Sequence, residues 1–235
     1  MDEMNELCFH HAYGVFCIET GNYTQAVQTF NSALSPLKGI LSERTMGSIQ
    51  SPHEDTESGG SSTDVDFEAS KVVTTPQYHR IVSTPHWDFV PARNTHPVFR
   101  NPLMIPQKPQ SDDQLLFVVL YNLALSHHLF ALYHSDLDHN LYRRAQQLWE
   151  IVYKLHLKKT LGLSTLQTCA ILNNLGNVYK ALGDAESCQR CFKALLSAMV
   201  WLRESGEADC RNDDERFFHS VSQVLLTECR AAPAA

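Results

Sequence analysis

The stretch LNNLGNVYKALGDAESCQRCFKAL, residues 172–195, decides how this chain folds. Its apolar residues recur at intervals of three and four, which predicts two amphipathic helices. Gly183-Asp184 lies between them and predicts a tight turn. The stretch at residues 10–33, HHAYGVFCIETGNYTQAVQTFNSA, carries glycines and aromatic residues at the same spacings. Internal repeats of this kind indicate that one supersecondary unit is used more than once. We therefore predict two copies of one αα-hairpin, far apart in the chain.

The two copies align without gaps at five positions. Each position has a physical reason. A small residue in the first helix lets the second helix approach, a turn glycine permits a backbone conformation that other residues avoid, and an aromatic residue fills the groove between the helices. The spacings are 7, 5, 4 and 3 residues in both copies. The aligned positions are Gly14, Gly21, Ala26, Phe30 and Ala33 in the first copy, and Gly176, Gly183, Cys188, Phe192 and Leu195 in the second.

This pattern resembles the tetratricopeptide repeat, which places a Leu-Gly pair, an aromatic residue and a turn glycine at these offsets. The pair of helices predicted between the two copies, after residue 112, departs from this pattern, with Leu123-Ala124 in place of Leu-Gly. Ala124 and Ala145 are 21 residues apart where 12 are expected, so nine extra residues lengthen this hairpin, and we place them around residues 134–140.

The resemblance implies an all-α fold, a right-handed superhelix of three αα-hairpin repeats with a C-terminal capping helix. A long insertion separates the first repeat from the others, and eight of the chain's ten prolines lie between about residues 38 and 112. The predicted parts are repeat 1 (residues 3–37), the insertion (38–111), repeat 2 (112–160), repeat 3 (164–203) and the capping helix (209–230).

The two parts of the insertion differ in their predicted structure. Residues 48–70 carry six acidic residues, a Gly-Gly-Ser-Ser run and no Lys or Arg, a composition that predicts disorder. Residues 72–109 hold short β-prone pieces, which form either a hairpin or an extended segment packed on a helix surface. Ser51, Thr75 and Thr84 each precede a proline and are candidate sites of proline-directed phosphorylation.

Composition narrows the class of partner. The chain of 235 residues has 19 basic and 26 acidic side chains, a net charge of −7, which argues against nucleic acid and anionic membrane surfaces. Its longest apolar run, residues 115–120, is much shorter than the roughly 20 residues of a membrane-spanning helix. The acidic start argues against a signal peptide. We expect an intracellular, cytoplasmic protein with a protein or peptide partner; the nucleus and the oligomeric state stay open.

No sequence motif of an enzyme or of a closed zinc site is present, so we predict a non-enzymatic protein without a cofactor. One alternative is a redox or metal-binding protein that uses Cys188 and Cys191 with nearby histidines. The simpler interpretation is that both cysteines pack as small apolar residues on one helix.

The candidate peptide-binding residues lie on the first helices of the repeats, which line the concave groove of a tetratricopeptide array. Asn173 and Asn177 are four apart and project together, with Asn174 and Lys180 on their flank. Asn122 is the counterpart of Asn174 in repeat 2. Asparagine amides suit the backbone of an extended peptide. The run at 172–179 resembles kinesin-light-chain-type repeats, which bind cargo peptides; a solvated polar helix face is the alternative.

Two further hypotheses concern the same groove. The chaperone-tail clamp of some tetratricopeptide proteins holds a terminal carboxylate with basic residues and asparagines. Its Lys and Asn positions in the first repeat fall on His11 and Val15, and its Lys and Arg positions in the third repeat fall on Ala170 and Asn174. Only an asparagine position, at Asn122, matches, so we reject that clamp. The protein is alternatively a structural subunit whose groove is filled by its own insertion.

Overall fold

The computed structural model describes residues 3–47, 97–106, 109, 111–134, 139–157, 164–204 and 221. These residues form six helices and no strand, which confirms the predicted all-α fold. The helices are α1 (Glu3–Glu19), α2 (Tyr23–Gly47), α3 (Asp112–His134), α4 (His139–Leu157), α5 (Thr165–Leu182) and α6 (Ala185–Glu204).

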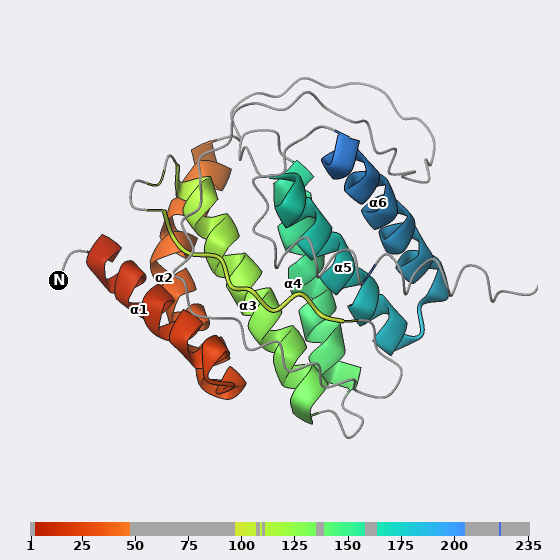
Figure 1. The fold of residues 1–235 in the computed structure, drawn as a ribbon. Helices are drawn as coiled ribbons and strands as arrows, with labels where there is room; N and C mark the ends of the chain where they lie inside the picture. The colour runs from red at the N-terminus through yellow and green to blue at the C-terminus, as the bar shows by residue number, and fades with distance from the viewer. Residues whose placement is uncertain are drawn as a thin grey trace, which may run out of the picture.

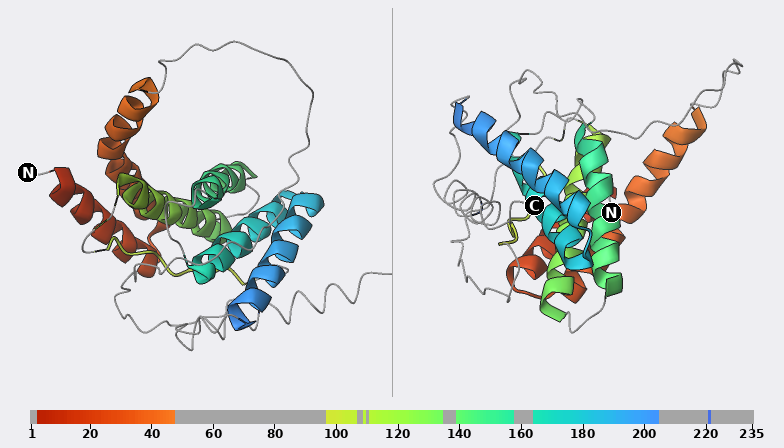
Figure 2. Two further views of the ribbon diagram at one scale, coloured as in Figure 1. Left: turned by 90° about the horizontal axis from the view of Figure 1, so that it is seen from above. Right: turned by 90° about the vertical axis from the view of Figure 1, so that its right-hand side faces the viewer.

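The helices pack as three hairpins that stack in chain order (Figure 1). Helices α1 and α2, α3 and α4, and α5 and α6 form the hairpins. The second helix of each of the first two hairpins also packs on the first helix of the next, so α2 contacts α3 and α4 contacts α5. The stack curves when it is seen from above (Figure 2).

The first and third hairpins turn in the same way. Gly21 and Gly183 both have a φ of 77°, in the left-handed region that favours glycine. The N–H groups of Asn22 and Asp184 donate to carbonyls five residues earlier, at 2.8 and 3.0 Å. The Asn22 and Asp184 side chains then accept N–H groups of the next helix, at 3.3 and 3.0 Å. The turn chemistry is therefore repeated 162 residues apart.

The helix glycines of these hairpins allow close packing on an aromatic ring. A Cβ atom built on Gly14 would lie 2.6 Å from Phe30 Cζ, and one built on Gly176 would lie 2.8 Å from a ring carbon of Phe192. Both distances are shorter than van der Waals contact. Each ring therefore occupies the space that a side chain would take, as the aligned positions predict.

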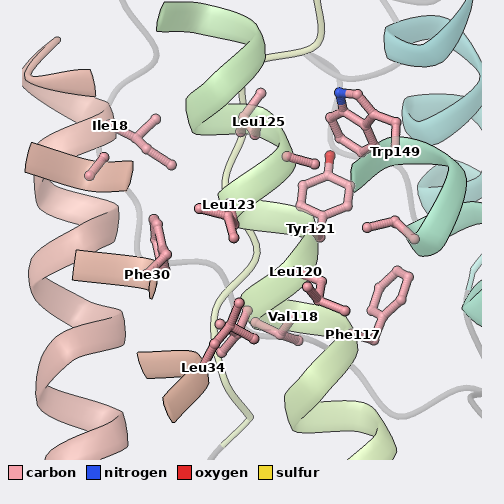
Figure 3. Close-up of a cluster of buried hydrophobic side chains, with 14 of the residues drawn as sticks. Ile18, Phe30, Leu34, Phe117, Val118, Leu120, Tyr121, Leu123, Leu125 and Trp149 are labelled. Carbon is pink, nitrogen blue, oxygen red and sulfur yellow. The ribbon is translucent and has the colours of Figure 1, made fainter. Parts of the chain in front are cut away.

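Helix α3 lies in the centre of the stack and is buried on nearly every side. Tyr121 packs edge-on against Trp149 of α4 at 5.1 Å, and Leu123 lies on the other side of α3, toward α2 (Figure 3). By length and composition α3 would be long enough to cross a membrane, but 83% of its most apolar window is buried inside the fold. Among the described residues, this core position accounts for its apolar composition.

Helix α2 ends later than the predicted end of repeat 1. Helix α2 continues through Pro36 to Gly47, whereas we expected repeat 1 to end at residue 37. Leu34 and Leu37, on either side of the proline, are both buried in the core that α2 shares with α3. Their burial offsets the hydrogen bond that a proline removes from a helix.

The nine extra residues of the second hairpin do not form a long loop. Compared with the first hairpin, five of them extend α3 beyond Ala124 and three extend α4 before Ala145. Helix α4 begins at His139, so the connection itself is only one residue longer. Eight of the nine extra residues are therefore helical, although we placed them around residues 134–140.

Beyond the end of α2, most of the described part of the insertion is an extended segment, residues 97–106, that packs on the helices. The other β-prone pieces, at 71–75, 80–82 and 88–90, and the candidate phosphorylation sites Ser51, Thr75 and Thr84 lie outside the described residues. Of the predicted capping helix, only Val221 is described; it is helical and buried against α5 and α6.

Candidate peptide-binding site

Residues 97–106 lie across the first helices of all three hairpins. In Figure 1 this segment, drawn in yellow, passes α3 and runs on to α5. Hydrogen bonds connect Pro97 and Phe99 to α5, and Leu103 to α3 and α1. The segment therefore runs opposite to the order of the repeats. We call the side of α1, α3 and α5 that contacts it the inner face.

Asn174 of α5 holds both backbone groups of Phe99. Its Oδ1 atom accepts the Phe99 N–H at 2.8 Å, and its Nδ2 atom donates to the Phe99 carbonyl at 2.9 Å. An asparagine amide thus replaces the neighbouring strand that an extended segment would have in a sheet. Asn174 is fully buried, so water does not compete for these hydrogen bonds.

Asn122 of α3 makes the same pair of bonds to Leu103. Its Oδ1 atom accepts the Leu103 N–H at 2.8 Å, and its Nδ2 atom donates to the Leu103 carbonyl at 2.7 Å. His11 of α1 joins this contact, because its Nε2 atom lies 3.0 Å from both the Leu103 carbonyl oxygen and Asn122 Nδ2. Either tautomer allows one of these hydrogen bonds. We call the two-bond contacts of Asn174 and Asn122 asparagine brackets.

Burial keeps His11 neutral. Desolvation lowers the pKa of His11 to about 4, although its contact with the Leu103 carbonyl acts in the opposite direction. The His11 ring also packs edge-on against Phe30 at 5.9 Å. A charged His11 would therefore be disfavoured within the packed first repeat.

Pro97 is held by its carbonyl alone. Asn173 Nδ2 donates to the Pro97 carbonyl at 3.0 Å, and Asn177 Nδ2 donates to it at 3.4 Å. The same two side chains also bond within α5: Asn173 Nδ2 to Asn174 Oδ1, and Asn177 Nδ2 to the Asn173 carbonyl. The Oδ1 atoms of Asn173 and Asn177 are buried and have no hydrogen-bond partner among the described residues.

Apolar side chains of the segment enter the two core clusters. Val98 is buried in the cluster that includes α2, α3 and α4, whereas Phe99 is buried in the cluster of α5, α6 and Val221. Leu103 is partly buried against the first cluster. The backbone contacts hold any sequence, but these buried side chains require apolar residues.

Arg100 projects from the segment onto a pair of tyrosines. Its guanidinium donates to the Tyr133 hydroxyl at 2.7 Å and lies 5.4 Å from the centre of the Tyr133 ring. Tyr133 stacks on Tyr23 of α2 at 5.2 Å. This aromatic pair suits a cationic side chain. Desolvation raises the pKa of Tyr23 to about 12, so its hydroxyl stays neutral beside Arg100.

Four of the five predicted binding residues meet at this segment. Asn122, Asn173, Asn174 and Asn177 contact it, and Asn174, which we placed on the flank, makes a complete bracket, as Asn122 does. Lys180 lies in the last turn of α5, where its carbonyl accepts the N–H of the turn glycine.

Sequence reasoning missed three residues of the site. His11 aligns with Asn173 when the repeats are superposed, so the repeat alignment contained a signal for it. The contact of Arg100 with Tyr133 had no such signal, because it joins the insertion to the end of α3.

The alternative site at Cys188 and Cys191 has different chemistry. Burial raises the pKa of the Cys191 thiol to about 12, opposite to the shift that a reactive thiol requires. Within the described residues, no three His, Cys, Asp or Glu side chains gather as metal ligands would.

The fold and the inner face together define an all-α repeat protein that holds an extended segment on the first helices of its hairpins. Residues 170–198 match the family model of the tetratricopeptide repeat, and this part of the chain is a tetratricopeptide repeat. Such repeats generally mediate protein–protein interactions. Searches of curated proteins and of solved structures found no match.

Proposed function

We propose that this protein is a non-enzymatic protein-interaction module that binds an extended peptide segment of a partner on its inner face. The observation that carries the proposal is the pair of asparagine brackets. Asn174 and Asn122 each hold the N–H and the carbonyl of one residue, on successive repeats. Backbone groups are common to all peptides, so a partner segment can make the same bonds.

The chain's own residues 97–106 occupy this site, and a partner must displace them. Because the segment is tethered, its effective concentration at the inner face is high, on the order of millimolar for a flexible connection. A partner peptide in trans therefore binds measurably only when it exceeds this internal competition or when the internal segment is weakened. The full chain with Phe99→Ser and Leu103→Ser provides such a weakened segment.

The test is fluorescence polarisation with a labelled peptide of residues 97–106. We expect the peptide to bind the Phe99→Ser/Leu103→Ser chain and to lose affinity at least tenfold when Asn122→Ala and Asn174→Ala are added. Asn31→Ala is the matched control, because Asn31 is an exposed asparagine on α2 whose side chain donates to the Val27 carbonyl of the same helix. Circular dichroism checks that every variant is helical. Absence of binding to all folded variants would contradict the proposal.

A second candidate function is a structural subunit whose inner face is permanently filled by residues 97–106. Val98 is buried in one core cluster and Phe99 in the other, which favours this candidate. Under it, the Phe99→Ser/Leu103→Ser chain loses stability and binds no peptide. The same polarisation experiment therefore separates the two functions.

A further inference from the structure

The contact at Pro97 is an asparagine bracket with one bond missing. Pro97 and Phe99 are alternate residues of an extended segment, so their backbone groups face the same helix. Asn174 both accepts from and donates to Phe99. Asn173 donates to the Pro97 carbonyl in the same way, but proline has no N–H to donate in return.

Two acceptor atoms are left over at this position. In the part of the chain that the structure describes, Asn173 Oδ1 and Asn177 Oδ1 are buried without a hydrogen-bond partner, in side chains that are 0% and 5% exposed. Their amide groups cannot simply be reversed, because both Nδ2 atoms already donate to the Pro97 carbonyl and to neighbours on α5. A buried acceptor without a donor is unfavourable, and most such atoms in folded proteins find a partner. The inner face is therefore built for a donor that its present occupant lacks.

We propose that the preferred occupant of the inner face is an extended segment of a partner protein with a non-proline residue at the Pro97 position. The backbone N–H of that residue completes the third bracket. Residues 97–106 are then an incomplete internal ligand that holds the site until the partner segment displaces them. This inference rests on the proposed function, because it assumes that the inner face binds peptides in trans.

The internal segment also shows what else the partner segment carries. The Val98 and Phe99 positions are buried and require apolar side chains, the second of them large. The Arg100 position faces the Tyr133 ring and hydroxyl and suits a cation. An apolar residue at the Leu103 position covers the core near α3. The partner segment thus carries a residue other than proline, an apolar residue, an aromatic residue and Arg at the positions of residues 97–100, and an apolar residue at the Leu103 position.

Three synthetic peptides test the missing donor. The first has the sequence of residues 97–106, the second replaces its first residue by alanine, and the third replaces it by N-methylalanine; all are acetylated. Alanine restores the N–H, whereas N-methylalanine lacks both the N–H and the proline ring. On the Phe99→Ser/Leu103→Ser chain we expect the alanine peptide to bind about fivefold tighter than the other two, the effect of one net hydrogen bond.

The intact chain offers a second measurement that does not need the weakened segment. Pro97→Ala gives the internal segment the missing N–H, so we expect hydrogen exchange at the Phe99 amide to slow about fivefold, because the segment opens less often. Pro102→Ala is the control, because it also replaces a proline of this segment by alanine. Asn173 and Asn177 contact Pro97 instead. We expect Pro102→Ala to leave this exchange rate unchanged or to raise it.

The outcomes separate the inference from the function on which it rests. If no peptide binds the weakened chain, the proposed function fails. If the three peptides bind equally, or if alanine and N-methylalanine are equally favourable, peptide binding stands but the N–H inference is overturned. An unchanged exchange rate at Phe99 in Pro97→Ala also overturns it.

Discussion

The first and third hairpins share their turns and their glycine–phenylalanine packing, yet they expose different surfaces. Phe9, Tyr13 and Phe16 of α1 are 67%, 44% and 57% exposed. Their counterparts in α5, 162 residues later, are Ile171, Leu175 and Val178, and all three are buried.

The difference has a physical origin in the stack. The α5 residues belong to the core cluster that includes Trp149 and Val152, so α4 of the preceding hairpin covers them. Helix α1 has no preceding hairpin within the described residues. The same helix position is thus core in one repeat and surface in another, which shows that stacking, more than local sequence, decides burial in repeat proteins.

Acid is expected to destabilise the first two hairpins most strongly. Burial lowers the pKa of His11 to about 4 and that of His128 to about 3, where Arg100 adds to the effect. Unfolded histidine binds a proton near pH 6.5, so between pH 6.5 and 4 the unfolded state binds more protons and stability falls as the pH falls. His11 alone contributes roughly 3 kcal/mol to this loss.

Urea unfolding between pH 7 and pH 4 measures this dependence. His11→Gln removes one of these titrating groups and should make the curve shallower between pH 6.5 and 4 by about the His11 contribution, because His127, His128 and His156 still titrate. Helices α5 and α6 contain no histidine. Hydrogen exchange should therefore show α1 to α3 opening at a higher pH than α5 and α6, and simultaneous opening of all helices would contradict the expected order.

Alanine substitutions at the buried α5 positions and at the exposed α1 positions are expected to change the free energy of unfolding by different amounts. Ile171→Ala removes a fully buried side chain and should lower the free energy of unfolding by about 3 kcal/mol. Phe9→Ala, at the matching position of α1, should change it by less than about 0.5 kcal/mol. Urea unfolding of both variants measures the difference. Equal costs would show that another part of the protein covers α1.

The loss of an asparagine bracket is expected to have the next largest effect on stability. Asn174→Ala removes both buried hydrogen bonds that Asn174 makes to the Phe99 backbone and should cost about 2 kcal/mol in the free energy of unfolding. Asn122→Ala should cost less, because His11 still lies 3.0 Å from the Leu103 carbonyl and can donate to it. The exposed Asn31→Ala is the control. A larger cost at Asn122 than at Asn174 would show that His11 does not replace the lost donor.

The local rules of the repeat were readable in the sequence, whereas contacts made by the insertion were not. Gly14 and Gly176, with the rings of Phe30 and Phe192, were predicted because they interact within one hairpin at fixed spacing. The contact of Asn174 with Phe99 spans 75 residues. No spacing rule connects such positions, so the sequence singled out the asparagines that contact residues 97–106 but not the segment itself.

The turn glycines give the smallest expected effect and test how far the two hairpins are equivalent. Gly21 and Gly183 have the same φ of 77°, and a Cβ atom at either position meets no atom within 4 Å. Alanine therefore adds no clash, only backbone strain of about 1 kcal/mol. Asparagine tolerates this conformation better than alanine does, so Gly21→Asn and Gly183→Asn should recover part of the loss.

Equal strain need not give equal global destabilisation, because the two turns lie in different parts of the stack. The first hairpin contacts the others through the packing of α1 and α2 on α3, whereas the third hairpin is packed both on α4 and against Val221. A repeat with fewer contacts at the end of a stack can open before the rest unfolds. Local opening near Gly21, measured by hydrogen exchange, should then show the full strain of Gly21→Ala, while global unfolding in urea shows less of it than for Gly183→Ala. If both turns cost the same in both measurements, the first hairpin unfolds together with the others, and residues 97–106, which connect α1 to α5, are the link that couples them.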